Sequence, residues 1–190
     1  MYGLNVARDA VTRSRTGRVT QGYTDCIAAH QHGFPNTVAA LGTALGERHI
    51  HLLRRFADKI VLVLDGDDAG RTRTNEILEL FVAQQVDLRI LSLPGGADPC
   101  DYLTAHGAES FGTLVETAVD ALEHRLRTAT QGIDAATETH RSHQAIEEVL
   151  GTLAKSSGSS GAGTAIAIRV DQILNRLARQ FGVSEERLRT

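Results

Sequence analysis

The chain contains no tryptophan, and only 4% of its 190 residues are aromatic. Proteins that bind single-stranded nucleic acid by stacking bases depend on aromatic side chains, so this composition argues against a stacking surface of that kind. The two cysteines, Cys26 and Cys100, lie far apart and form no C-x-x-C pair, which excludes a zinc site of that type and indicates a reduced, cytoplasmic protein. No run of about 18 apolar residues occurs, so no membrane span is expected.

The remaining composition is that of an ordinary globular protein. Apolar residues make up 42% of the chain and charged residues 23%. The net charge of −3 does not provide the strongly basic face that a stand-alone DNA-binding domain requires.

The most informative stretch is an apolar run that ends in acidic residues. Ile60 to Leu64 shows no alternation of apolar and polar residues, which is typical of a strand buried on both faces. Asp65 and Asp67 follow at once, and Gly66 and Gly70 allow the chain to turn sharply there. Two carboxylates placed two residues apart in a turn can both face one hard cation such as Mg²⁺. Alternatively, they form an acidic loop that caps the helix after it.

Strand and helix patterns alternate over the first part of the chain. Besides the run at 60–64, strands are expected at 18–23, 36–41 and 87–93, with helices between them. This alternation predicts an α/β fold with a parallel or largely parallel sheet flanked by helices. Asp25 follows the first strand and Asp98 the last, so both are expected at the same edge of the sheet as the acidic turn after residue 64.

From position 108 onward only helical periodicity is expected, and the segment 156–163 (SSGSSGAG) is predicted to be a flexible linker. The pattern predicts a helical lead-in over 1–16, an α/β domain over 17–113 and an all-α helical module over 114–190.

Five segments, in order, resemble the TOPRIM domain, and among TOPRIM proteins they are most similar to the bacterial (DnaG-type) DNA primases. They are Gln21-Gly22-Tyr23-Thr24-Asp25, similar to E-G-Y-x-D in all but its first position; Ala39 to Leu45, similar to A-x-x-G-T-A-L; Asp65 to Gly70, similar to D-G-D-x-A-G; Leu93 to Pro99, similar to most of L-P-x-G-x-D-P-D; and Gln180 to Glu186, similar to the end of the primase polymerase domain.

This resemblance implies a TOPRIM-type fold with a divalent metal centre that holds Mg²⁺ or Mn²⁺. The residues implied are Asp65 and Asp67 for the catalytic metals, Asp25 and Asp98 for support or further ions, Gln21 at the position of the family glutamate, and Arg71 with Gly66 and Gly70 for phosphate.

The activity implied by the resemblance is DNA-directed synthesis of RNA primers. A ribonucleoside monophosphate would be transferred from an NTP to an RNA primer on a single-stranded DNA template by a two-metal mechanism. In the family, a separate domain contacts the replicative helicase, and a zinc ribbon and a basic subdomain hold the template. No counterpart of these parts is found in the 190 residues, so we expect the chain alone to bind metal but to make little or no primer.

Two positions depart from the family pattern and keep other interpretations open. Gln21 carries no charge, and Cys100, a soft ligand, stands where an aspartate is expected. Both departures favour a non-catalytic TOPRIM module that binds a nucleotide or a partner. An unrelated phosphatase of the HAD-like type would place its Asp-x-Asp after the first strand. A receiver domain would need a lysine at a late strand end, whereas Lys155 lies in the helical region.

Overall fold

The computed structural model describes residues 1–41, 45–64, 86–157 and 164–189, and the chain divides into two compact units, residues 1–120 and 121–190. Within the described ranges, no helix has the length and apolarity needed to cross a membrane.

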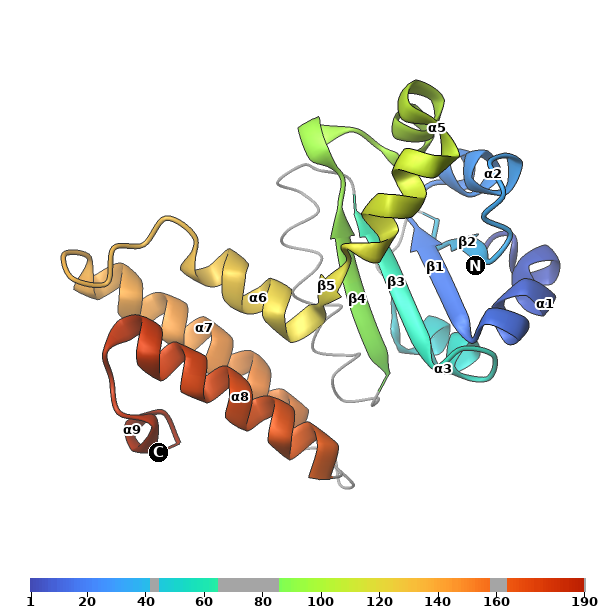
Figure 1. The fold of residues 1–190 in the computed structure, drawn as a ribbon. Coiled ribbons are helices and arrows are strands. Elements are labelled where there is room, and N and C mark those ends of the chain that lie inside the picture. Colours follow the sequence, from blue (N-terminus) through green and yellow to red (C-terminus); the bar gives the residue numbers. More distant parts are fainter. Residues whose placement is uncertain (42–44, 65–85, 158–163, 190) are drawn as a thin grey trace. The chain divides into compact units, whose positions relative to one another are not determined.

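The first unit is built on a five-stranded sheet with the order β2-β1-β3-β4-β5 (Figure 1). The first four strands are parallel, and β5 runs antiparallel to β4. The strands are β1 (Thr16–Thr20), β2 (Thr37–Ala39), β3 (Lys59–Leu64), β4 (Asp87–Ser92) and β5 (Val119–Asp120). The expectation of a largely parallel sheet flanked by helices and followed by a helical module is confirmed.

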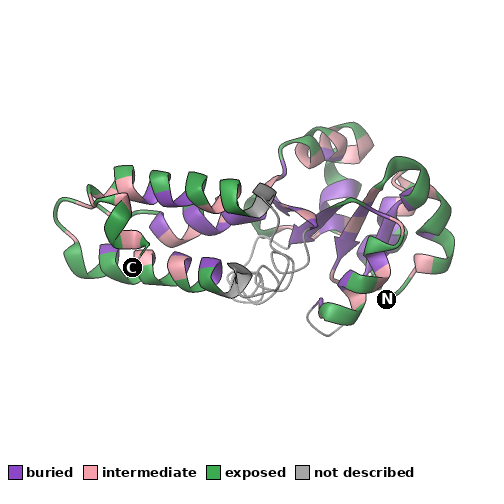
Figure 2. Cartoon of the chain, turned by 90° about the horizontal axis from the view of Figure 1, so that it is seen from below, coloured by how far each residue is buried: buried purple, intermediate pink, exposed green. Residues whose placement is uncertain are grey.

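Helices cover both faces of the sheet. Next to Gly17 in β1 lie Val11 of α1 (Leu4–Ser14) and Leu53 of α3 (Glu47–Arg54), so these two helices share one face. On the other face, α2 (Tyr23–Gln31) and α5 (Pro99–Glu116) pack over Val61 and Val63 of β3. Ile60 to Leu64 are all at most 5% exposed, which confirms the strand predicted to be buried on both faces. Figure 2 shows this pattern, with buried strands between helices that are exposed on their outer sides.

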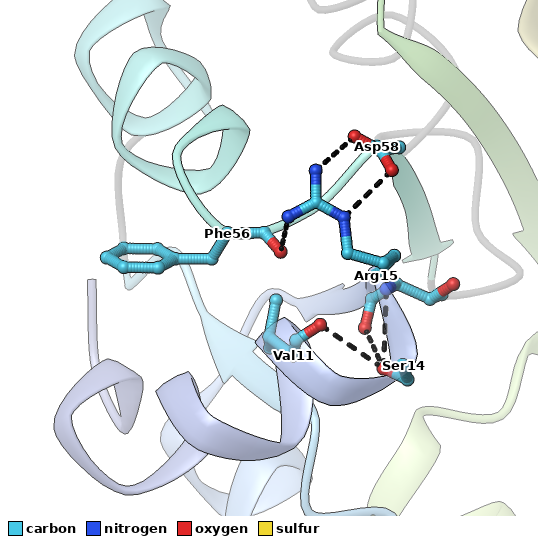
Figure 3. Close-up of polar contacts among 6 residues, drawn as sticks. Val11, Ser14, Arg15, Phe56 and Asp58 are labelled. Atoms are coloured by element: carbon cyan, nitrogen blue, oxygen red, sulfur yellow. Dashed lines mark hydrogen bonds and ion pairs between the residues drawn. The ribbon is translucent and has the colours of Figure 1, made fainter.

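The start of the sheet is fixed by Arg15, in the turn between α1 and β1 (Figure 3). Its Nε and Nη2 donate to the two carboxylate oxygens of Asp58 at 2.9 and 2.5 Å, and its Nη1 donates to the backbone carbonyl of Phe56 at 3.3 Å. A planar guanidinium matches a carboxylate in this two-bond geometry. The residue therefore ties the entry of β1 to the entry of β3.

Two sequence expectations are wrong in detail. The first strand spans Thr16–Thr20 and not 18–23, because α2 begins at Tyr23 and uses Gly22 as its N-cap. The expectation of helix alone after position 108 fails at β5, where Val119 pairs with Ile90 and Asp120 with Arg89. A two-residue edge strand is too short to produce a period of its own, and its pairing with β4 is what places it in the sheet.

The second unit consists of helices. They are α6 (Ala121–Thr130), α7 (Thr139–Ser157), α8 (Thr164–Phe181) and the short α9 (Glu185–Leu188). Its core is formed by buried apolar side chains of the three longer helices, among them Leu126, Val149 and Leu177. Of the linker predicted over 156–163, residues 158–163 lie outside the described part of the chain.

A partly buried ion pair links α6 to α7. The side chain of Arg125 is 7% exposed, and its Nη1 lies 2.5 Å from Oε1 of Glu148, whose side chain is 45% exposed. The Arg125 Nε donates to the hydroxyl of Thr152 at 3.3 Å, and that hydroxyl also donates to the Glu148 carbonyl at 3.1 Å. Most of the desolvation cost of this pair therefore falls on the Arg125 guanidinium, because it is the group that is removed from water.

We expect the two partners to respond unequally to substitution. Glu148→Gln should lower the free energy of unfolding by about 1–3 kcal/mol, because it leaves the buried guanidinium of Arg125 without its counter-charge. The loss stays in this range because position 148 itself is half-exposed. Arg125→Met should cost less than about 1.5 kcal/mol, since an apolar side chain of similar length fills the space and Thr152 keeps its bond to the Glu148 carbonyl. Urea unfolding of both variants checks this, and a larger loss in Arg125→Met would contradict it.

Candidate metal centre at the carboxyl edge of the sheet

The parallel strands bring several sequence-predicted site residues to one edge. The register pairs Val19 with Leu62 and Leu64 with Ser92, so β1, β3 and β4 end side by side. Gln21 follows β1 directly, and Asp98 follows β4 after a short turn. The predicted residues Asp65, Asp67, Gly66, Gly70 and Arg71 come after the last residue of β3 and lie outside the described part of the chain.

Asp25 connects two of the loops at this edge. It lies in the first turn of α2 and is 4% exposed. One carboxylate oxygen accepts the backbone N–H of Gly22 at 2.9 Å, and the other accepts the backbone N–H of Cys100 at 3.3 Å. The carboxylate thus joins the turn after β1 to the beginning of α5, 75 positions further along the chain.

Glycine at position 22 allows the Asp25 carboxylate to approach the backbone closely. A Cβ atom built there would lie 2.9 Å from Oδ2 of Asp25, closer than a Cβ atom normally approaches an oxygen. The match to the glycine of the E-G-Y-x-D segment therefore has a local steric reason.

Asp98 is the N-cap of α5. Its Oδ1 accepts the backbone N–H of Asp101 at 2.7 Å, and Pro99 occupies the first turn of the helix. Both features are typical of a helix start. Capping uses one oxygen of Asp98, and the remaining lone pairs of the carboxylate can still serve a cation.

The electrostatics of this edge favour a cation. Burial raises the pKa of Asp25, the negative charges of Asp98 and Asp101 raise it further, and the N–H bonds from Gly22 and Cys100 work in the opposite direction. A buried carboxylate beside other carboxylates is the arrangement that a bound divalent ion stabilises. Asp25 and Asp98 supply carboxylate oxygens, which are the donor type for the hard cation that the TOPRIM resemblance implies.

The two thiols are poorer ligands for a hard cation than the carboxylates of this edge. Burial, followed by the charge of Asp25, raises the pKa of Cys26 to about 11. Burial and the carboxylates of Asp98, Asp25 and Asp101 also raise the pKa of Cys100. Both shifts favour the protonated thiol, and a thiolate is in any case a soft ligand that is poorly matched to Mg²⁺. Cys100 contributes to this edge through its backbone N–H, which donates to Asp25. A role of the backbone cannot be predicted from the residue type alone.

Among the described ranges, no group of three His, Cys, Asp or Glu side chains could hold a metal ion. Gln21 is half-buried, and its backbone carbonyl accepts the N–H of Leu41 at 3.1 Å. Its side chain can offer a neutral amide oxygen, a weaker ligand for a hard cation than a carboxylate.

Comparison with known proteins gives consistent matches. A Toprim-like family model matches residues 18–103. The DNA primase of Clostridium acetobutylicum is 36% identical over 137 residues, which cover 70% of this chain and 22% of that protein. The DNA primase of Halalkalibacterium halodurans is 30% identical over 190 residues, which cover 100% of this chain and 30% of that protein.

Solved primase structures share the fold of the chain. A DNA primase domain from Pseudomonas aeruginosa is 30% identical with a TM-score of 0.81, over 98% of this chain and 57% of that one. A DnaG primase catalytic domain bound to single-stranded DNA is 25% identical with a TM-score of 0.78, over 98% of this chain and 57% of that one. The chain thus spans less than a third of the two curated relatives. It is a homologue of the catalytic core of bacterial DNA primases and belongs to that family, with a TOPRIM-like domain over residues 18–103.

Proposed function

We propose that the chain is part of the catalytic core of a DNA primase, a DNA-directed RNA polymerase that makes short RNA primers from NTPs on single-stranded DNA during replication. The observation that carries the proposal is the acidic edge of a TOPRIM-like sheet, where Asp25 and Asp98 lie beside the end of the strand that precedes Asp65 and Asp67. Primer synthesis of this kind would take place in the cytoplasm.

The proposed metal ligands are carboxylates. Asp65 and Asp67 would hold Mg²⁺ or Mn²⁺, with Asp25 and Asp98 supporting the ions or binding further ones. Bound divalent ions supply stabilisation of the attacking and leaving oxygens in nucleotidyl transfer. Gln21 occupies the position of the family glutamate but cannot take up a proton as a carboxylate does. Arg71, Gly66 and Gly70 would contact the phosphates of the NTP.

The proposed partners follow from the family. A single-stranded DNA template is supported by the related primase domain bound to single-stranded DNA. The replicative helicase would be contacted through a region of the primase outside these 190 residues.

Primer synthesis in a chimaera tests the proposal. The chain would replace the homologous segment of the Halalkalibacterium halodurans primase, to which it aligns over 190 residues. We expect the chimaera with Gln21→Glu to make primers and the same chimaera with Asp65→Asn/Asp67→Asn to make none. Activity that survives the double substitution would contradict the proposed site.

We expect the 190-residue chain alone to make little or no primer. Robust synthesis by it from single-stranded DNA and NTPs would contradict that expectation.

A second function is favoured by Gln21 and Cys100, which replace two acids of the family pattern. It is a non-catalytic TOPRIM module that binds a nucleotide or a partner. A chimaera that folds and gains no activity from Gln21→Glu would support this alternative.

A further inference from the structure

A second, basic site lies at the opposite end of the strands from the acidic edge. A cavity of about 260 Å³ opens there, lined by strand residues that include Arg18, Lys59 and Arg89 and by the end of α5. We propose that this cavity binds a phosphate group, either as a free phosphate monoester or within a nucleic acid.

The register of the sheet explains why three cations meet in this cavity. Arg18 in β1 pairs with Val61 in β3, and Val61 pairs with Arg89 in β4. Residues paired across parallel strands project from the same face of a sheet, so the two arginines flank Val61 on the face that α5 covers. Lys59 precedes Val61 by two residues and projects from that face as well.

The Arg18 guanidinium has hydrogen-bonding capacity left over. It lies over the ring of Phe34, with Cζ 5.0 Å from the ring centroid, and its Nη1 donates to Oδ1 of Asn36. Its Nε–H is buried and has no hydrogen-bond partner in the described part of the protein. A buried donor without a partner calls for an acceptor such as an ion or a water molecule. Phe34 and Asn36 fix the guanidinium in place, so little side-chain entropy is lost when an anion binds.

The described residues that line the cavity carry more positive than negative charge. Glu116 is the one acid among the described residues that line the cavity, whereas Arg89 also pairs with Asp87 at 3.2 Å and lies opposite Asp120 in the register of β4 and β5. The charge of the nearby Asp58 is taken up by Arg15, as Figure 3 shows. Lys59 makes no ion pair within the described ranges.

The size of the cavity indicates the chemical class of the ligand. Pockets for drug-sized ligands measure about 300–1,000 Å³, so a cavity of about 260 Å³ takes a phosphate or a sugar phosphate and not a whole dinucleotide. Arginine and lysine together are the usual recognition pair for a phosphate, since arginine donates in a planar fork and lysine acts as a point charge.

The test is a titration of the ¹⁵N-labelled chain with inorganic phosphate, in the presence of a chelator that keeps metals away from the acidic edge. Amide and side-chain Nε–H resonances are followed by NMR spectroscopy. We expect a saturable shift of the Arg18 Nε–H and of the backbone amides of Lys59 and Arg89. The Nε–H of Arg15, which already donates to Asp58, is the internal control and should not shift.

Variants make the assignment specific. Lys59→Gln/Arg89→Gln should weaken phosphate binding on the order of tenfold or more, since each lost charge removes a charge-assisted contact. The matched control Arg13→Gln removes an exposed arginine of α1 that does not line the cavity, and it should change the dissociation constant less than about twofold. The spectra also report whether each variant is folded.

Two further ligands identify the source of the phosphate. If adenosine 5′-monophosphate shifts the same resonances, the ligand is a free phosphate monoester. If a single-stranded oligonucleotide without a terminal phosphate displaces inorganic phosphate from the cavity, the ligand is a nucleic-acid backbone. Shifts that do not saturate, that occur only at the acidic edge, or that weaken equally in Arg13→Gln would overturn the proposal. Because no metal or catalysis is needed, this result is independent of the proposed primase activity.

Discussion

Asp25→Ala is expected to lower the free energy of unfolding by about 2–4 kcal/mol. The substitution leaves the partly buried backbone N–H groups of Gly22 and Cys100 without their acceptor, and each unsatisfied donor costs about 1–3 kcal/mol. Part of this cost is offset because alanine also removes a carboxylate whose ionised form is disfavoured by burial. Urea unfolding of the chain measures the difference.

The control for this prediction is Asp101→Ala. Asp101 is exposed in the first turn of α5, and its role in the cap is played by its backbone N–H. Its loss should cost less than about 1 kcal/mol, the usual size of a charge effect at a helix start. If Asp25→Ala costs no more than Asp101→Ala, the carboxylate of Asp25 does not hold the two loops together.

Gln21→Glu is expected to raise the affinity of the chain for Mn²⁺ by about tenfold or more. It adds one negative charge at the edge where the carboxylates of Asp25 and Asp98 already lie, and a factor of ten in affinity corresponds to about 1.4 kcal/mol. In the chimaeric primase the same substitution should raise the rate of primer synthesis by about 100-fold, the scale of a positioned carboxylate base. Calorimetric titration and a primer assay measure the two effects.

Gln31→Glu provides the matched control. It makes the same chemical change at the last residue of α2, away from the first turn that holds Asp25. We expect less than about a twofold change in Mn²⁺ affinity. Equal gains in the two variants would mean that position 21 is not part of the metal centre.

The strands that form this edge could be predicted from the sequence, because they depend on local patterns. The apolar run at 60–64 has no alternation, and the structure places it in a strand buried on both faces. The order of strands and acids along the chain was enough to bring Gln21 and Asp98 to the same edge, since parallel strands share the direction of their ends.

Features that depend on long-range pairing were not predicted. The bond from the Cys100 N–H to Asp25 joins positions that no local pattern relates. The strand β5 is defined by two pairs with β4 and not by its own sequence. The basic cavity depends on the register that places Arg18 and Arg89 on either side of Val61. A signal existed for the cavity, namely an arginine inside each of two predicted strands, but only the register shows that they meet.

The most direct test of the metal centre is a calorimetric titration with Mn²⁺ of the chain and of its Asp65→Asn/Asp67→Asn variant. These substitutions keep the shape of both side chains and remove their charge. We predict that the chain binds Mn²⁺ and that the variant does not. Binding of equal strength in both, or no binding in the parent chain, would contradict a metal centre built on Asp65 and Asp67 at the carboxyl edge of this sheet.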